Sequence, residues 1–387
     1  MKLNNISDYY SSILFYIYVP VTFIIWLLVV TNRTVLVGAY SLSIIAILGY
    51  LLVSINKIKL DKNYLLVALF LIYCFTLTSI HYMYMDAKDI LGRSLALFHY
   101  NLYLMYLSAY LYGRYVNFKV NIISYTFFII ILILISTIVD FSKFSLDFSL
   151  INPDSIAIYL ALANLFTIYL IFLITNTSKN WLRLLLFTLG CMFLFLLNSR
   201  SSLYAFVIVM LIYQGLFLKS GSRTLNVLMI SIAVLILLST SYFDTLIENN
   251  SRMLAIFNDI GADDSVNERK LLFEVGLERT LNKPIMGDYG GVIKEFNNLG
   301  SYIHNILSYW QAYGLIPFML VVYFFLIQAA YISYKSFKDR FVIKSDIYFN
   351  ISIYTILLLV ISQSYAWHYA WFFLGFLHTY KSIKISK

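Results

Sequence analysis

The chain has 387 residues, of which 61% are hydrophobic and only 12% are charged, with a mean hydropathy of +0.80. Soluble domains carry about 25% charged residues, so this composition excludes an ordinary soluble protein. The net charge of +9 does not indicate nucleic-acid binding, because the basic residues are scattered through short connecting segments. The two cysteines, Cys74 and Cys191, stand inside apolar segments and are interpreted as buried apolar side chains.

Apolar stretches recur along the whole chain. Runs of about 17–25 apolar residues are typical of transmembrane helices, and continuous rather than alternating hydrophobicity favours helices over a membrane barrel. The sequence therefore predicts an all-α, polytopic integral membrane protein with about 12 transmembrane helices. The predicted spans are 13–30, 34–55, 64–84, 94–112, 122–139, 156–175, 184–197, 203–218, 224–241, 306–331, 347–363 and 366–380.

One long polar segment divides these spans. We expect residues 1–241 to hold the first nine helices, 242–305 to form a large loop, and 306–387 to hold the last three. With the N-terminus in the cytoplasm, the inner segments carry 17 Lys and Arg residues and the short outer loops carry 5. Because cytoplasmic loops are enriched in Lys and Arg, both termini are predicted to be cytoplasmic and the large loop to lie outside.

The large loop contains one predicted helix. Ser265 and Glu268 fit a capping box, with Ser265 as the N-cap, and Pro284 ends the helix because the residue before a proline disfavours helical geometry. The apolar stripe of this helix consists of Val266, Phe273, Leu277 and Leu281. This spacing predicts an amphipathic helix over 266–281 that lies at the outer membrane surface.

Two arginines are candidates for binding an anion. Arg269 lies one helical turn before Phe273, beside the apolar stripe, where its planar guanidinium suits bidentate contact with a lipid phosphate. Arg200 lies in a short outer connection, against the positive-inside bias. The alternatives are nonspecific headgroup contact for Arg269 and snorkelling to the interface for Arg200.

His304, at the outer end of the tenth predicted span, is the candidate for proton transfer. An imidazole has a reference pKa of about 6.5 and can act as a general base near neutral pH; the alternative is a structural histidine. The other histidines are interpreted as packing residues: His81, His99, His368 and His378. Aromatic residues near the C-terminus are interpreted as an interfacial belt: Tyr365, Trp367, Tyr369 and Trp371.

The sequence does not predict a metal site. Asp259, Asp263 and Asp264 are the densest acidic group, and a solvated loop that leads into a helix explains them better than cation binding. The remaining histidines and cysteines do not have the spacing of metal ligands.

Three segments together resemble the family of O-antigen polymerases and O-antigen ligases. They are Leu197-Asn198-Ser199-Arg200-Ser201-Ser202; Asn267-Glu268-Arg269-Lys270 with Phe273, Gly276, Leu277, Pro284 and Gly287; and His304-Asn305 followed by Gly314. They occur in the order found in that family and on the same predicted side of the membrane. Each segment is a weak signal alone, and the order makes the resemblance more specific.

The resemblance implies a GT-C-like glycosyltransferase in the bacterial inner membrane, acting on the periplasmic face without a metal or other cofactor. It implies that Arg200 and Arg269 bind the diphosphate of an undecaprenyl-diphosphate-linked glycan and that His304 is the catalytic base. Asn305, Arg252 and Tyr289 are candidates for supporting roles. The implied partners are lipid-linked donor and acceptor glycans, membrane lipids, and a chain-length regulator and flippase of the same pathway, with no nucleic acid.

Within the family, the sequence favours a repeat-unit polymerase for O-antigen or capsular polysaccharide over a ligase. Eight residues separate Asn305 from Gly314, one fewer than in the ligase pattern, and only 34 separate Arg269 from His304. The alternatives are an O-antigen ligase, a polysaccharide flippase or transporter, and a non-catalytic assembly subunit. Ion-coupled transporters usually carry acidic residues within their spans, whereas all nineteen carboxylates here fall in predicted loops or at span ends.

Overall fold

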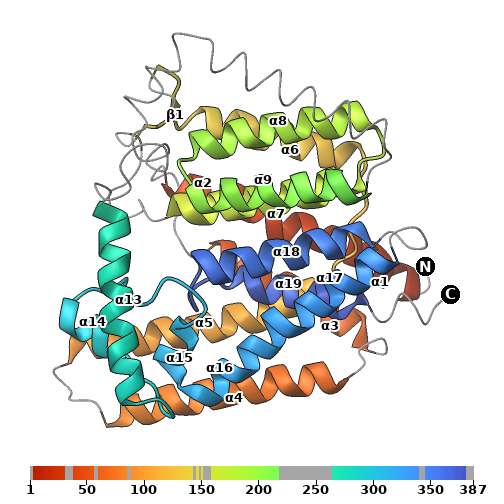
Figure 1. The fold of residues 1–387 in the computed structure, drawn as a ribbon. Helices are drawn as coiled ribbons and strands as arrows, with labels where there is room; N and C mark the ends of the chain where they lie inside the picture. The colour runs from red at the N-terminus through yellow and green to blue at the C-terminus, as the bar shows by residue number, and fades with distance from the viewer. Residues whose placement is uncertain are drawn as a thin grey trace. The chain divides into compact units, whose positions relative to one another are not determined.

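The computed structural model is almost entirely helical (Figure 1). It describes residues 3–30, 38–55, 60–84, 89–142, 145–147, 150, 158–217, 264–339 and 345–380. The chain forms two units, and each is described by itself. Unit 1 comprises Met1–Leu48, Val116–Ala262 and Ser336–Tyr354; unit 2 comprises Gly49–Tyr115, Asp263–Lys335 and Thr355–Lys387.

Unit 1 begins with one long helical rod. α1 (Leu3–Tyr16) continues through a π-helical turn, η1 (Ile17–Val21), into α2 (Thr22–Val30). Pro20 lies inside the π turn, and a proline there accounts for the change in helical geometry because it cannot donate the usual backbone hydrogen bond. The further helices of this unit include α6 (Ile122–Ser136), α7 (Ile158–Asn176), α8 (Asn180–Leu196) and α9 (Arg200–Phe217).

A small hairpin interrupts the predicted all-α architecture. Strands β1 (Val139–Asp140) and β2 (Ser145–Leu146) pair in antiparallel register, with Val139 opposite Leu146. Between them, Asp140 Oδ1 accepts a hydrogen bond from the Ser142 backbone N–H at 2.9 Å. Asp140 thus stabilises a local turn, which hydrophobicity alone did not predict.

Unit 2 is built around two closely packed helices, α5 (Ile90–Tyr115) and α19 (Tyr369–His378). A Cβ atom on Gly113 would collide with the Phe372 carbonyl, and one on Gly375 with the Tyr110 carbonyl. Small residues of this kind let membrane helices approach through their backbones. The unit also contains α4 (Lys62–Met83), α13 (Asp264–Asn282), α14 (Gly291–Phe296), α15 (Ser308–Tyr313) and α16 (Leu315–Val322).

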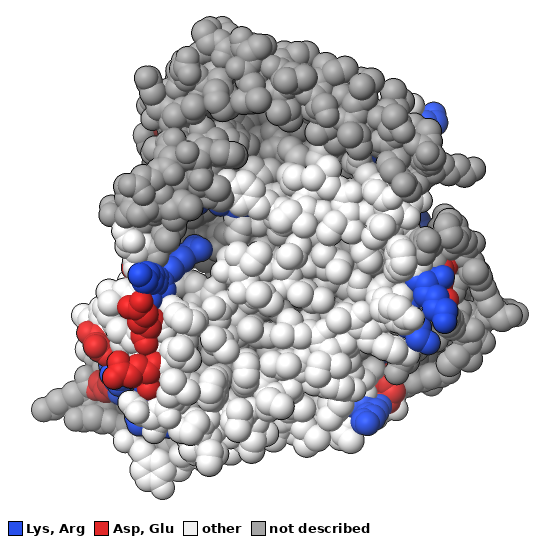
Figure 2. All heavy atoms as spheres, in the orientation of Figure 1, with Lys and Arg blue, Asp and Glu red and all other residues white. Residues whose placement is uncertain are grey.

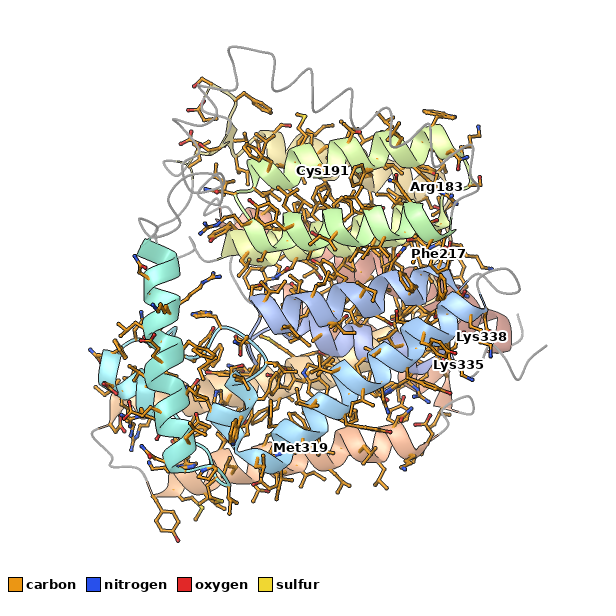
Figure 3. All side chains as sticks on the ribbon, viewed as in Figure 1. Arg183, Cys191, Phe217, Met319, Lys335 and Lys338 are labelled. Carbon is orange, nitrogen blue, oxygen red and sulfur yellow. The ribbon has the colours of Figure 1, made fainter. Side chains whose placement is uncertain are left out.

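Three helices contribute residues to both units: α3 (Gly38–Val53), α17 (Ala329–Lys338) and α18 (Asp346–Ile361). α16 runs through the π-helical η5 (Tyr323–Gln328) into α17. In Figure 3, Met319 lies near one end of this rod, and Lys335 and Lys338 lie near the other. This places the lysines at the end of the rod that is predicted to face the cytoplasm.

In the described part of the chain, five helices are long and apolar enough to cross a membrane. They are Tyr9–Leu28, Lys62–Met83, Tyr159–Asn176, Arg200–Phe217 and Leu315–Lys338. Shorter apolar helices are Ile44–Val53, Ile122–Ser136, Asn180–Leu196 and Asp346–Ile361. The helical architecture is therefore confirmed and supports a membrane protein, whereas the total of twelve spans stays a prediction. The predicted span 224–241 lies outside the described residues.

The tenth predicted span begins later than expected. Instead of one helix from residue 306, the chain forms α15, breaks at Gly314 and starts again as α16 at Leu315. Gly314 has φ +81°, and a Cβ atom there would collide with the carbonyl of Ile285. Glycine is therefore required at this break, and the segment before it becomes part of the site described next.

Candidate functional site

Helix α13 carries Arg269 and runs beside α14 and α15 (Figure 1). The structure starts this helix at Asp264, so Ser265 is not its N-cap. Leu281 of the predicted apolar stripe is 56% exposed, as a side chain that faces the membrane surface would be, and the placement of α13 at that surface stays a prediction. The face that packs inside unit 2 consists of Leu272, Gly276 and Thr280. Gly276 allows close contact with the residues around His304, which a period of hydrophobic side chains does not reveal.

A charged cluster fixes the loop that follows α13. The Asp288 carboxylate, 4% exposed, lies 2.6 Å from Arg279 Nε and 3.1 Å from Lys283 Nζ. Burial opposes ionisation, but the hydrogen bonds from Arg279 and Lys283 outweigh it, and the pKa of Asp288 is lowered. Figure 2 shows the charged side chains of this part of unit 2 gathered over α13 and α14.

His304 lies in a short irregular segment before α15, and backbone contacts hold that segment on both sides. The N–H of Ile303 donates to Gln311 Oε1 at 2.9 Å, and the N–H of Ile306 donates to the Leu359 carbonyl at 2.7 Å. Asn305 Oδ1 accepts from the N–H of Leu307 at 2.9 Å. Asn305, predicted as a supporting residue, thus caps the turn that leads into α15.

The structure brings Arg269 and His304 together within unit 2. His304 is half-buried, and its pKa is lowered to about 4, first by burial and second by the positive charge of Arg269. At neutral pH the imidazole is therefore uncharged and able to accept a proton. Arg269 is an exposed residue of α13, and its charge acts on this base.

Aromatic rings form the wall behind His304. The Tyr302 ring lies 4.9 Å from the ring of His304 and 4.9 Å from that of Tyr365, centroid to centroid. Burial raises the pKa of Tyr302, while Ser364 and Arg269 act in the opposite direction. Tyr302 is therefore a neutral phenol at physiological pH. Its position two residues before His304 is the sequence signal that could have identified it.

The aromatic residues predicted to form an interfacial belt are buried instead. Tyr365, Trp367, Tyr369 and Trp371 are between 0% and 4% exposed. They pack inside the unit because α19 lies closely against α5. The Tyr365 backbone N–H donates to Ser308 Oγ at 2.8 Å, and its carbonyl accepts from the Tyr106 hydroxyl. A belt and a buried aromatic cluster have the same composition, so the sequence could not separate them.

Tyr289, the other predicted supporting residue, packs on two histidines. Its hydroxyl lies 3.0 Å from His99 Nδ1, and its ring stacks on His81 at 4.5 Å. Both histidines therefore pack, as the sequence predicted. The ring of His99 is also 5.2 Å from that of Tyr365, so Tyr289 contributes to the layer behind Tyr302.

Arg200 belongs to unit 1, where it is the first residue of α9. Asn198 has φ +55°, which turns the chain between α8 and α9. Ser199 Oγ donates to Ser202 Oγ at 3.0 Å, and Ser202 Oγ donates to Asn164 Oδ1 of α7 at 3.1 Å. A cation at a helix N-terminus is opposed by the helix dipole, and an anion bound there would relieve that repulsion.

Most of the remaining predicted residues lie outside the part of the chain that the structure describes. Arg252, Asp259 and Asp263 lie outside the described residues, and Asp264 is described only as the start of α13. Among the residues that the structure describes, no group of three His, Cys, Asp or Glu side chains could hold a metal ion.

Comparison with known proteins agrees with the predicted resemblance. The sequence pattern of the family described as O-antigen ligase matches residues 184–319, a segment that contains Arg200, Arg269 and His304. No curated protein matches the chain. Proteins of this family are glycosyltransferase-like enzymes, either polymerases or ligases, and the match does not distinguish the two. The O-antigen ligase domain at residues 184–319 supports membership of the chain in the family of O-antigen polymerases and ligases.

Proposed function

We propose that the protein polymerises undecaprenyl-diphosphate-linked oligosaccharide repeat units into O-antigen or capsular polysaccharide. The observation that carries this proposal is the pair in unit 2: an uncharged His304 beside an exposed Arg269. A base next to a cation suits a reaction in which a hydroxyl loses a proton while a diphosphate leaves.

The proposed reaction is a direct displacement. A hydroxyl oxygen of the acceptor sugar attacks the anomeric carbon of the donor, and the bond from that carbon to the diphosphate oxygen breaks. The hydroxyl proton passes to a ring nitrogen of His304, and Arg269 and Arg200 stabilise the negative charge that develops on the leaving diphosphate. One displacement inverts the anomeric centre. The arginines supply the charge that a divalent cation would otherwise provide.

We further propose that the site faces the periplasm and that both termini lie in the cytoplasm. The distribution of Lys and Arg supports this orientation. In this orientation the site meets a glycan that has already been flipped across the membrane.

The alternative is a ligase that transfers finished polymer to the sugars of a lipid A-core, which the description of the matched family favours. The two activities share a donor and differ in the acceptor. The short segment between Arg269 and His304 supports the polymerase, because it leaves little protein to surround a large core oligosaccharide.

The glycolipids of a deletion strain test the proposal. Loss of a polymerase leaves surface lipid that carries a single repeat unit, or removes the capsule if the polymer is capsular. Loss of a ligase leaves bare core while long polymer accumulates on undecaprenyl diphosphate. Accumulated lipid-linked polymer would therefore contradict the polymerase and identify the ligase.

A further inference from the structure

Gln311 holds the backbone next to His304. The side-chain carbonyl of Gln311 accepts the hydrogen bond of the Ile303 N–H at 2.9 Å. Gln311 is 4% exposed and Ile303 is 1% exposed, so water does not replace this contact easily. A buried backbone N–H that loses its acceptor carries the full cost of its lost hydration, which makes this bond important for the local geometry.

The same glutamine also contacts the helix that carries Arg269. A Cβ atom on Gly276 of α13 would lie 3.0 Å from Gln311 Nε2 and 2.7 Å from Ile303 Cγ1. The α13 backbone therefore packs directly against the Gln311–Ile303 contact. Gly276 follows Arg269 by seven residues, about two helical turns, so the distance of α13 from this contact also affects the position of Arg269.

Gln311 itself is held rigidly by its backbone. Its N–H donates to the Leu307 carbonyl at 2.9 Å, and its carbonyl accepts from the Asp288 N–H at 2.8 Å. Gly287, with φ +75°, allows this approach, because a Cβ atom there would lie 2.7 Å from the Gln311 carbonyl oxygen. The side chain of Gln311 is thus a fixed point between α13, the loop of Asp288 and the segment of His304.

We propose that Gln311 is a positioning residue of the transfer reaction: through Ile303 it fixes the imidazole of His304, and through Gly276 it fixes the separation of His304 from Arg269. This inference rests on the proposed function above. Gln311 acts at a distance, so its loss is expected to affect the geometry of the base more than the binding of either glycan.

The pKa of His304 reports on this geometry. Among the described residues, the charge of Arg269 on α13 acts on the imidazole, the Tyr302 ring lies against it, and Tyr365 packs on the ring of Tyr302. Burial and the charge of Arg269 hold the pKa of His304 at about 4. If the segment relaxes away from α13, both effects weaken, and the pKa moves up toward the reference value of about 6.5.

The first test replaces Gln311 by methionine, which has similar length and lacks the acceptor. The full-length protein in lipid nanodiscs, with carbon-13-labelled histidine, provides five imidazole signals, and the signal absent in His304→Ala identifies His304. In Gln311→Met we expect the pKa of His304 to rise and kcat to fall about 10–100-fold, because small misplacements of a reacting group have effects of this size. The KM for the lipid-linked donor is expected to change by less than about threefold, since uniform binding is retained.

Gln311→Glu is the conservative variant, because it keeps an acceptor oxygen at the same place. We expect it to restore most of kcat, and it remains informative if Gln311→Met does not fold; the His304 titration is compared between wild type and Gln311→Met, because a carboxylate at position 311 would itself raise the pKa of the imidazole. The control Gln328→Met removes a different hydrogen-bonded glutamine of unit 2, whose Oε1 lies 2.7 Å from His378 Nε2. It is expected to leave the His304 titration unchanged.

A second pair of variants tests the α13 side of the contact. Gly276→Ala pushes Ile303 and Gln311 away from α13, whereas a Cβ atom on Gly215 of α9 meets nothing within 4 Å. Alanine favours helix at both positions, so lower kcat in Gly276→Ala alone reflects the contact and not helix stability. We expect about a tenfold loss in Gly276→Ala and less than a twofold change in Gly215→Ala.

The outcomes separate this inference from the proposed function. An unchanged His304 titration together with unchanged kcat in Gln311→Met would overturn the positioning role. Full activity in His304→Ala would overturn the proposed base, whatever the titration shows. If both stand, Gln311→Met in the His304→Ala background is expected to cause little further loss, because two residues that act through one group are not additive.

Discussion

Arg200 and His304 lie in surroundings of two different kinds. The turn that carries Arg200 is fixed by neighbours in the sequence, by the left-handed backbone of Asn198 and the bond of Ser199 to Ser202. The segment of His304 is fixed by Gln311 of α15, a few residues further along the chain, and by Leu359 of α18, which is distant in the sequence. The turn of Arg200 is thus held by local bonds together with the contact of Ser202 with Asn164 of α7, whereas the segment of the base depends on α15 and α18.

This difference suggests a division of roles in the proposed reaction. Binding a diphosphate tolerates some freedom, because the guanidinium side chain is long and attracts the anion over several ångströms. Removing a proton does not tolerate such freedom, since the base must come within hydrogen-bond distance of one hydroxyl. The residues that require precise placement are those that unit 2 holds with buried contacts.

Removal of the base is expected to have the largest effect. His304→Ala should lower the rate of glycan transfer by about 100–10,000-fold, the usual contribution of a general base. His304→Gln should be nearly as inactive, because glutamine keeps a hydrogen bond but cannot take the proton. The measurement is polymer formed by purified protein from a lipid-linked repeat unit, with each variant's level in the membrane as a control. Activity that survives in both variants would show that His304 is not the base, and the precise placement of its segment would then have no role in the reaction.

Removal of the arginines is expected to be nearly as severe. Arg269→Ala and Arg200→Ala should each lower kcat by about 100-fold or more, the scale of losing one group that stabilises charge in the transition state. Arg269→Lys should recover only part of the rate, because a point charge lacks the bidentate geometry. Transfer assays with chelator present should give the same ranking. Wild-type product from both alanine variants would favour headgroup contact and snorkelling instead.

The pH dependence of transfer should distinguish the two arginines. Because the pKa of His304 is lowered to about 4, its neutral form predominates from pH 8 to about pH 5. Activity should therefore be flat over that range and fall as the pH approaches 4. Arg269→Gln removes a positive charge beside the imidazole, so the pKa should rise and the fall should begin at higher pH. The pH profile of kcat/KM measures this directly.

Arg200→Gln is the matched control for that profile. It is expected to lower the rate across the whole range and leave the position of the acid limb unchanged, because the described shift of His304 arises from burial and Arg269. A shift of the same size in both variants would mean that both arginines act on His304. The two arginines would then not have separate effects on the base.

Much of the helical fold follows from the sequence because its signal is local. Long apolar runs predict the spans, and α4, α7 and α9 each begin within three residues of the predicted positions. The break at Gly314 was missed because an apolar stretch continues through it. What requires the break is a carbonyl from Ile285, and hydrophobicity carries no information about such a contact.

The sequence predicted the charged and titratable residues of the candidate site, but it did not predict the residues that hold them in place. Arg269 and His304 stand out because polar residues are rare at the ends of apolar segments. Tyr302 and Gln311 do not stand out, since aromatic and amide side chains are common there and their roles come from contacts across the unit. The face of α13 that packs inside unit 2 was not predicted for a related reason: Gly276 packs closely because it lacks a side chain, whereas a hydrophobic period identifies only large side chains.

The smallest expected effect concerns the charged cluster that supports the Gln311 side of unit 2. Asp288 is buried and accepts bonds from Arg279 at 2.6 Å and Lys283 at 3.1 Å. Asp288→Asn should lower the free energy of unfolding by about 1–2 kcal/mol, less than a fully buried pair would lose because both cations are partly exposed.

The matched control is Glu295→Gln, because Glu295 bonds the same arginine at 2.8 Å while 47% exposed. Exposed ion pairs contribute about 0–1 kcal/mol, so this change should have little effect. The pKa of Asp288 is lowered in the folded protein, so its contribution is present above the unfolded value of about 3.9 and is lost as the pH falls below it. Denaturant unfolding in nanodiscs should therefore show wild type and Asp288→Asn clearly separated at pH 7 and converging near pH 3. Equal losses from the Asp288 and Glu295 variants would mean that the cluster acts only as surface charge, and the loop would then depend on Gly287 and Gln311 alone.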